Sequence, residues 1–169
     1  EEGHKRVGFG LEGKAAILDL NYNHYQKATN MKLVSGVKEQ TLSGQEYNIS
    51  SQLPYMPWTT FNFQGYRFEN EKAAQDTKGN IYSLEMALNS SLQFVIDKDV
   101  SSVNGAEDEW NYKLTFTHPP KENKPTLLDG AITQEAFVKK NMQNSLKGKV
   151  RRNNNLAVEI QGAVVITRK

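Results

Sequence analysis

The sequence predicts a mainly β fold, either an antiparallel β-sandwich or a barrel, with one helix near the C-terminus. Two observations lead to this prediction. Apolar and polar residues alternate with a period of two along nine segments, which is typical of strands with one buried face. Turn-forming pairs such as Ser43-Gly44 and Asn104-Gly105 separate these segments at short intervals. Many short strands joined by such turns are characteristic of sandwiches and barrels.

The first predicted strand is about ten residues long and begins at Ala16, because Leu18, Leu20 and Tyr22 alternate there with polar residues. The other eight predicted strands span residues 31–37, 46–49, 58–63, 65–68, 81–88, 92–97, 110–117 and 156–167. Gly162 is expected to bend the last of them.

One segment breaks the two-residue pattern and predicts a helix from Thr133 to Leu146. Thr133 is a suitable N-cap, acidic Glu135 lies in the first turn, and Gly148 follows the last turn. We expect a single β-rich domain over residues 14–169, preceded by a flexible N-terminal segment at residues 1–13.

The composition excludes several kinds of chemistry. The chain has 169 residues and no cysteine, so disulfides, thiolate metal sites and cysteine nucleophiles are absent. The histidines form no ligand-spaced pair, and an acidic stretch that begins at Asp97 has Ser102 where a calcium loop needs glycine. No nucleophile elbow or other catalytic motif is present. We therefore expect no metal, no cofactor and no enzyme activity.

The predicted location is extracytoplasmic, meaning secreted, periplasmic or at the cell surface. The chain begins Glu1-Glu2-Gly3 without an initiator methionine, which fits a mature exported protein. No run approaches the roughly 18 apolar residues of a transmembrane helix, so we expect no membrane span.

The function that these observations favour is a non-enzymatic structural or interaction domain of an exported surface assembly. With its alternating strands, the chain resembles in outline the pilus-type subunits built on immunoglobulin-like sandwiches. The resemblance implies that an N-terminal segment, here residues 7–25, completes the sheet of a neighbour. The partners are then other protein subunits, including copies of the chain. The predicted interaction residues are Val7, Phe9, Leu11, Ala16, Leu18 and Leu20.

A second hypothesis is a carrier of a small apolar ligand. A helix placed after many strands and before a last strand is similar to the lipocalin layout. Alternating aromatic residues such as Phe61 and Phe63 are expected to form the core of the domain, or else to line the cavity of such a carrier. The predicted lining residues are Trp58, Phe61, Phe63, Trp110, Tyr112 and Phe116.

A third hypothesis follows from the distribution of charge. The net charge of +2 hides a basic C-terminal part and an acidic remainder, because Glu159 is the only acidic residue after Glu135. Basic clusters bind the phosphates of nucleic acid or anionic membrane surfaces. Few aromatic residues accompany this cluster, so nucleic acid is the less favoured polyanion. The candidate residues are Lys139, Lys140, Lys147, Lys149, Arg151 and Arg152.

Overall fold

The computed structural model describes residues 4–34, 36–71, 75–102, 107–120, 125–139, 157–160 and 163–166. In the last two ranges only the backbone is described. Eleven strands and one short 3-10 helix are assigned in these ranges, and all strand pairs are antiparallel. The prediction of a mainly β, antiparallel fold is confirmed.

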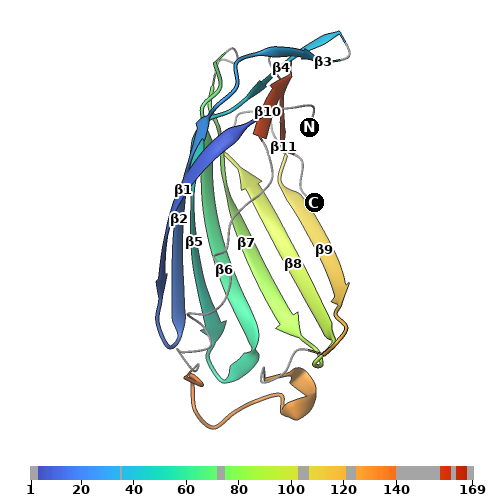
Figure 1. Ribbon diagram of the computed structural model, residues 1–169. Helices are drawn as coiled ribbons and strands as arrows, with labels where there is room; N and C mark the ends of the chain where they lie inside the picture. Colours follow the sequence, from blue (N-terminus) through green and yellow to red (C-terminus); the bar gives the residue numbers. More distant parts are fainter. Residues whose placement is uncertain are drawn as a thin grey trace.

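A seven-stranded sheet makes up most of the described structure, with the strand order β1-β2-β5-β6-β7-β8-β9. It is curved but does not close on itself (Figure 1). Each strand pairs with the one that follows it along the chain, except that β2 pairs with β5, because β3 and β4 belong to a second sheet. The strands are β1 (Arg6–Lys14), β2 (Leu18–Lys27), β5 (Gly44–Leu53), β6 (Met56–Phe68), β7 (Thr77–Ala87), β8 (Leu92–Ser101) and β9 (Glu109–Phe116).

A smaller sheet lies at the upper end of the large one in Figure 1, which gives a sandwich-like arrangement. Its strand order is β11-β10-β4-β3. The strands are β3 (Lys32–Val34), β4 (Val37–Thr41), β10 (Ala157–Ile160) and β11 (Ala163–Ile166). Because β4 leads directly into β5, the small sheet is fixed by the chain to the middle of the large one.

The two ends of the large sheet differ in the length of their connections. Residues 15–17, 54–55 and 88–91 join strands at one end, which we call the short-turn end. Residues 28–43, 69–76 and 102–108 join strands at the other, the long-loop end, where the small sheet lies. The 3-10 helix η1 (Leu127–Asp129) and the residues after it lie at the short-turn end, at the bottom of Figure 1.

The compact apolar core of the described residues is small and lies at the long-loop end. It consists of Tyr25, Leu42 and Phe68, with Tyr66 packed against it. Polar contacts join the strands and loops nearby: the carboxylate of Glu71 pairs with Lys27 and accepts a hydrogen bond of 2.6 Å from Gln40. The His4 Nε2 atom lies 3.3 Å from Glu39 Oε2 of β4. The core therefore holds the two sheets together rather than filling the large sheet along its length.

Four predicted strands differ from the observed ones. The strand expected at residues 31–37 is a hairpin of β3 and β4, because Gly36 takes a left-handed conformation with φ of 84° in the turn. The two strands expected at residues 58–63 and 65–68 are one long strand, β6, which runs through Gly65 without a turn. The run at residues 156–167 is divided into β10 and β11. Residues 6–13, placed by sequence in a flexible segment, belong to β1 (Arg6–Lys14), which pairs with β2 along its full length.

The predicted helix from Thr133 to Leu146 is not supported. Residues 133–139 contain no helix, and residues 140–146 lie outside the described residues. The reason is that the backbone groups of this segment bond to the β5–β6 turn instead of to each other. The Thr133 N–H donates to the carbonyl oxygen of Tyr55 at 2.9 Å, and the Tyr55 N–H donates to that of Ala136 at 2.7 Å.

Candidate functional site

The pairing register sorts the side chains of the large sheet onto two faces, because directly paired residues point to the same side. Leu20 pairs with Ile49, Ile49 with Phe63, and Phe63 with Tyr82, so all four share one face. We call this the apolar face. Its large apolar residues are Val7, Phe9, Leu11, Leu18, Leu20, Tyr22, Tyr47, Ile49, Phe61, Phe63, Tyr82, Leu84, Met86, Leu92, Phe94, Ile96, Val100, Trp110, Tyr112, Leu114 and Phe116.

The apolar face is the exposed face of the sheet. Leu11 at one edge is 61% exposed, and Phe116 at the other edge is 72% exposed. Between the edges the aromatic rings contact each other: the ring centroid of Phe63 lies 5.8 Å from that of Tyr47 and 5.3 Å from that of Tyr82. An exposed apolar surface that runs across all seven strands is unlike the small, scattered patches of a soluble monomer.

The opposite face is polar, and half of the buried polar residues in the described part of the chain lie on it. Ser50 Oγ donates to Asn62 Oδ1 at 2.6 Å, and Asn62 Nδ2 donates to Glu85 Oε1 at 3.1 Å. Gln93 Nε2 donates to the other oxygen of Glu85 at 3.1 Å. These bonds connect four neighbouring strands, β5 to β8, across what we call the polar face. Its most buried members are Asn23, Glu46, Ser50, Gln52 and Asn62.

Aromatic rings on the polar face also take part in polar contacts. The Tyr25 hydroxyl donates to Glu46 Oε2 at 3.1 Å, and the Arg6 guanidinium lies 3.7 Å from the centre of the Tyr25 ring. The Tyr66 hydroxyl donates to Asp99 Oδ1 at 3.1 Å. Each hydroxyl therefore has a carboxylate partner, as buried polar groups require.

The two faces are arranged in the opposite way to those of a soluble sheet, in which the apolar face is buried and the polar face meets water. Here the exposed face is apolar and the more buried face carries the hydrogen-bonded polar network. Such an arrangement is stable where the exposed face meets an apolar medium and the polar face meets water or polar groups. The sheet as a whole is therefore the candidate functional site.

At the short-turn end, residues 131–138 lie against the ends of β5 and β6. Trp58 Nε1 donates to the carbonyl oxygen of Ala131 at 2.8 Å, and Gln52 Nε2 donates to that of Val138 at 2.8 Å. Gln52 lies on the polar face, so the segment passes along that side of the sheet. These contacts are what replaces the predicted helix.

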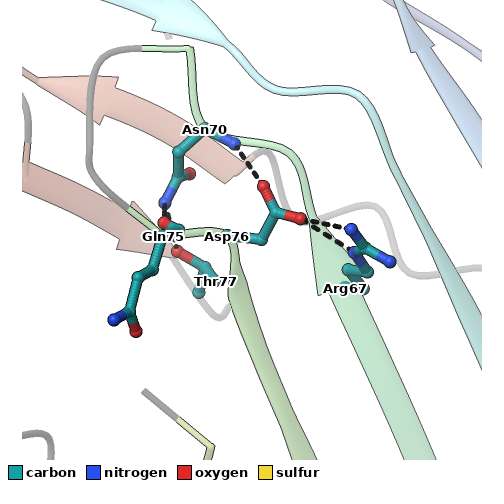
Figure 2. A network of polar contacts seen from close by, with 5 residues as sticks. All are labelled: Arg67, Asn70, Gln75, Asp76 and Thr77. Atoms are coloured by element: carbon teal, nitrogen blue, oxygen red, sulfur yellow. Dashed lines mark hydrogen bonds and ion pairs between the residues drawn. The ribbon is translucent and has the colours of Figure 1, made fainter. Parts of the chain in front are cut away.

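At the long-loop end, the β6–β7 loop is organised around Asp76 (Figure 2). Asp76 Oδ2 accepts hydrogen bonds from Arg67 Nε at 2.9 Å and Nη2 at 2.6 Å, and Asp76 Oδ1 accepts one from the Asn70 N–H at 3.4 Å. The Asn70 side chain in turn donates to Thr77 Oγ1 at 3.1 Å. The hydrogen bonds from Arg67 hold the pKa of Asp76 below its usual value.

We expect the order of this loop to depend on pH. Because the pKa of Asp76 is lowered on folding, its contacts stabilise the loop above the ordinary aspartate pKa and are lost as the pH falls through the lower folded value. The Asp76→Asn variant should show several-fold faster hydrogen exchange at the Asn70 amide at neutral pH, after correction for intrinsic rates. The effect on global stability should be small, because the pair is exposed to solvent. Equal exchange in the variant and the natural protein would contradict this role.

The structure places five of the six predicted interaction residues together. Val7, Phe9 and Leu11 of β1 and Leu18 and Leu20 of β2 lie side by side on the apolar face. Ala16 lies in the turn between these strands. Their role in binding another subunit stays a prediction.

Five of the predicted ligand-lining residues also lie on the apolar face. Phe61 and Phe63 are on β6, whereas Trp110, Tyr112 and Phe116 are on β9, which β7 and β8 separate from β6. Trp58 instead contacts the segment at the short-turn end. The expectation that Phe61 belongs to the core is wrong, because its side chain is exposed.

Of the predicted polyanion-binding residues, Lys139 is described and exposed. The others, Lys140, Lys147, Lys149, Arg151 and Arg152, lie outside the described residues. The carrier and polyanion hypotheses both stay predictions. Within the described ranges, no three His, Asp or Glu side chains are grouped so that they could hold a metal ion. No helix in the described part of the chain is long and apolar enough to cross a membrane.

Sequence reasoning missed the polar network as a feature of the site. Glu46, Ser50 and Asn62 occupy alternate positions of their strands, as residues of a solvated face would. The signal was the presence of carboxylates within long strands, at positions that alternate with large apolar residues. That signal becomes specific only when the register shows that the polar rows are buried.

The fold and the two faces define an antiparallel β-domain whose exposed surface is apolar. The family model described as "Inverse autotransporter, beta-domain" matches residues 1–154, and the chain belongs to this family. It is thus an exported domain of the outer membrane or cell surface, of a secretion or adhesion type, and the predicted extracytoplasmic location is confirmed.

Comparison with other proteins adds support for the fold. A solved structure from the work "Unveiling the Mechanism Behind the in-meso Crystallization of Membrane Proteins" is similar, with a TM-score of 0.70 and 16% sequence identity. The match covers 92% of this chain and 67% of that chain. At this identity the likeness concerns the fold alone. No curated protein matches the chain.

Proposed function

We propose that the chain is a non-enzymatic structural domain whose seven-stranded sheet lies within the outer membrane. Its apolar face contacts lipid, and its polar face is turned away from lipid. The observation that supports this is the segregation of side chains by register, with apolar residues on the exposed face and a buried polar network on the other. Membrane-spanning strands alternate in this way.

The lengths of five of the seven strands agree with this function. A strand that crosses the hydrocarbon core at a tilt needs about 9–11 residues. The strands β1, β2, β5, β7 and β8 have 9, 10, 10, 11 and 10 residues. In the large sheet, all backbone groups except those on the outer edges of β1 and β9 can be paired between strands. A backbone within hydrocarbon needs such pairing, because no water is present to form hydrogen bonds with it.

The connections suggest an orientation. Sheets in the outer membrane have short turns on the periplasmic side and longer loops outside the cell. On this basis the long-loop end, with the small sheet and the loop around Asp76, faces outward. The short-turn end, with residues 131–138, faces the periplasm.

A second role concerns the edges of the sheet. Of the described strands, only β2 pairs with β1 and only β8 pairs with β9, so each has an outer edge available for strand addition. Neighbours are antiparallel throughout, so β1 and β9, the first and seventh strands, run in the same direction. An odd number of further antiparallel strands is needed to connect them. We propose that the predicted assembly role consists of adding such strands to these edges, either from the same polypeptide or from another copy.

Quenching of tryptophan fluorescence by brominated lipids tests the lipid contact. The two tryptophans are well placed for this: Trp110 lies 55% exposed on the apolar face, whereas the Trp58 indole is bonded to Ala131 at the short-turn end. In the Trp58→Phe variant, reconstituted into vesicles, the remaining Trp110 should be quenched strongly by brominated acyl chains.

The Trp110→Phe variant, which retains Trp58, is the matched control and should be quenched less. If aqueous iodide quenched Trp110 while brominated lipid did not, the apolar face would not be in contact with lipid and the proposed function would be wrong.

A further inference from the structure

The charged residues of the large sheet are divided between its two faces. Every carboxylate on its seven strands lies on the polar face, as the pairing of Ile81 with Asp99 and of Asp99 with Glu109 illustrates. These carboxylates belong to Glu12, Asp19, Glu46, Glu85, Asp97, Asp99 and Glu109. On the apolar face the same strands carry only cationic groups, Arg67, Lys78 and Lys98, together with His24.

The cationic groups gather near the long-loop end. Pairing places His24, Arg67 and Lys78 in one row across the sheet, through Gln45. The adjacent row contains Tyr22 paired with Tyr47, and beyond it the face is almost entirely apolar. Lys98 lies on the same face two rows further from the long-loop end, where it pairs with Tyr82 and Trp110, and its Nζ is 5.7 Å from the centre of the Trp110 ring. We call Arg67, Lys78 and Lys98 the basic row.

The carboxylates close to the basic row do not balance its charge. Arg67 and Lys78 are directly opposite each other on adjacent strands, an arrangement that is unfavourable for like charges. Asp76 bonds to Arg67, and Asp108 lies 2.9 Å from Lys98, so among the described residues two loop carboxylates pair with two of the three cations. A positive charge therefore remains at the border between the aromatic residues and the long loops.

We propose that the basic row binds the phosphate groups of lipids in the leaflet that surrounds the long-loop end. This inference rests on the proposed function and adds a lipid class and an orientation to it. The border of an apolar, aromatic-rimmed face is the level at which lipid head groups lie. A lysine near an anionic membrane surface contributes about 1 kcal/mol of attraction, equivalent to about a fivefold preference for anionic lipid.

The test uses Lys78→Gln and Lys98→Gln, singly and together, because neither change removes the bond between Arg67 and Asp76. The protein is reconstituted in mixed phosphatidylglycerol and phosphatidylcholine vesicles. Spin-labelled forms of both lipids then report the relative association constant of the anionic over the zwitterionic lipid. We expect this constant to fall about fivefold for each lysine replaced, and the natural preference to weaken at high salt.

Lys113→Gln is the matched control, since Lys113 pairs with Val95 on the polar face of β9 and should leave the preference unchanged. A preference that persists in the double variant, or that Lys113→Gln reduces equally, overturns the inference. Failure of the natural protein to enter vesicles overturns the proposed function as well. Insertion without any preference for phosphatidylglycerol overturns the basic row alone.

Discussion

Replacing Leu84 with arginine is expected to destabilise the membrane-embedded protein by about 2–4 kcal/mol, the cost of an arginine at the lipid-facing midplane of a strand. Leu84 lies in the middle of β7 and pairs with Phe61 on one side and Ile96 on the other. An arginine there has no carboxylate on the same face of the seven strands. Its charge would have to enter hydrocarbon or deform the bilayer.

The adjacent Ser83 provides the control, because its side chain lies on the polar face between Asn62 and Asp97. Ser83→Arg places the same charge on the same strand, beside a carboxylate, and should change the free energy of unfolding by less than about 1 kcal/mol. Unfolding by guanidinium in vesicles, followed by tryptophan fluorescence, measures both variants. Equal destabilisation of the two variants would show that the faces do not differ in their surroundings.

The sequence predicts the strands better than it predicts their surroundings. A period of two shows which residues share a face, and it correctly places Trp110, Tyr112 and Phe116 together on β9. It contains no information on whether that face meets a protein core or lipid, because both are apolar. From the sequence these three residues are predicted to line the cavity of a carrier, whereas the structure exposes them.

The boundaries that were missed depend on long-range contacts. Gly65 looks like a break between two strands, but in the structure the Tyr47 ring of the neighbouring strand covers it, so β6 continues. Thr133 has the features of an N-cap, yet its N–H bonds to Tyr55, far away in the sequence. Local propensity is overridden in both cases by a partner that the sequence does not identify.

The sequence contains the charged residues that divide between the two faces, but a count along the chain does not reveal this division. Counting residues along the chain contrasts a basic C-terminal part with an acidic remainder. Counting by face instead separates Asp97 and Asp99 from Lys98, which lies between them in the sequence. The second count needs the register, and it is the one that bears on lipid binding.

Gly44 and Gly65 lie on the same pair of strands, β5 and β6, and the substitution of each by alanine should have very different effects. A Cβ atom at Gly44 would lie 2.5 Å from the backbone oxygen of Arg67 and would also overlap the Phe68 ring. The backbone at Arg67 cannot move away without disturbing the pairing of Gly44 with Phe68 and the core beside it. We expect Gly44→Ala to reduce the free energy of unfolding by about 1–3 kcal/mol.

At Gly65, by contrast, the atoms that a Cβ would meet belong to the far end of the Tyr47 side chain. That ring lies on the apolar face, where it can rotate into the surrounding medium, so Gly65→Ala should cost less than about 1 kcal/mol. Gly13→Ala is a neutral reference, because its Cβ would lie 3.9 Å from Leu20 Cβ, an ordinary contact. Denaturant unfolding of the three variants in the same vesicles should rank them in this order. A larger loss for Gly65→Ala than for Gly44→Ala would mean that Tyr47 is held rigidly, which is incompatible with a face that contacts fluid lipid.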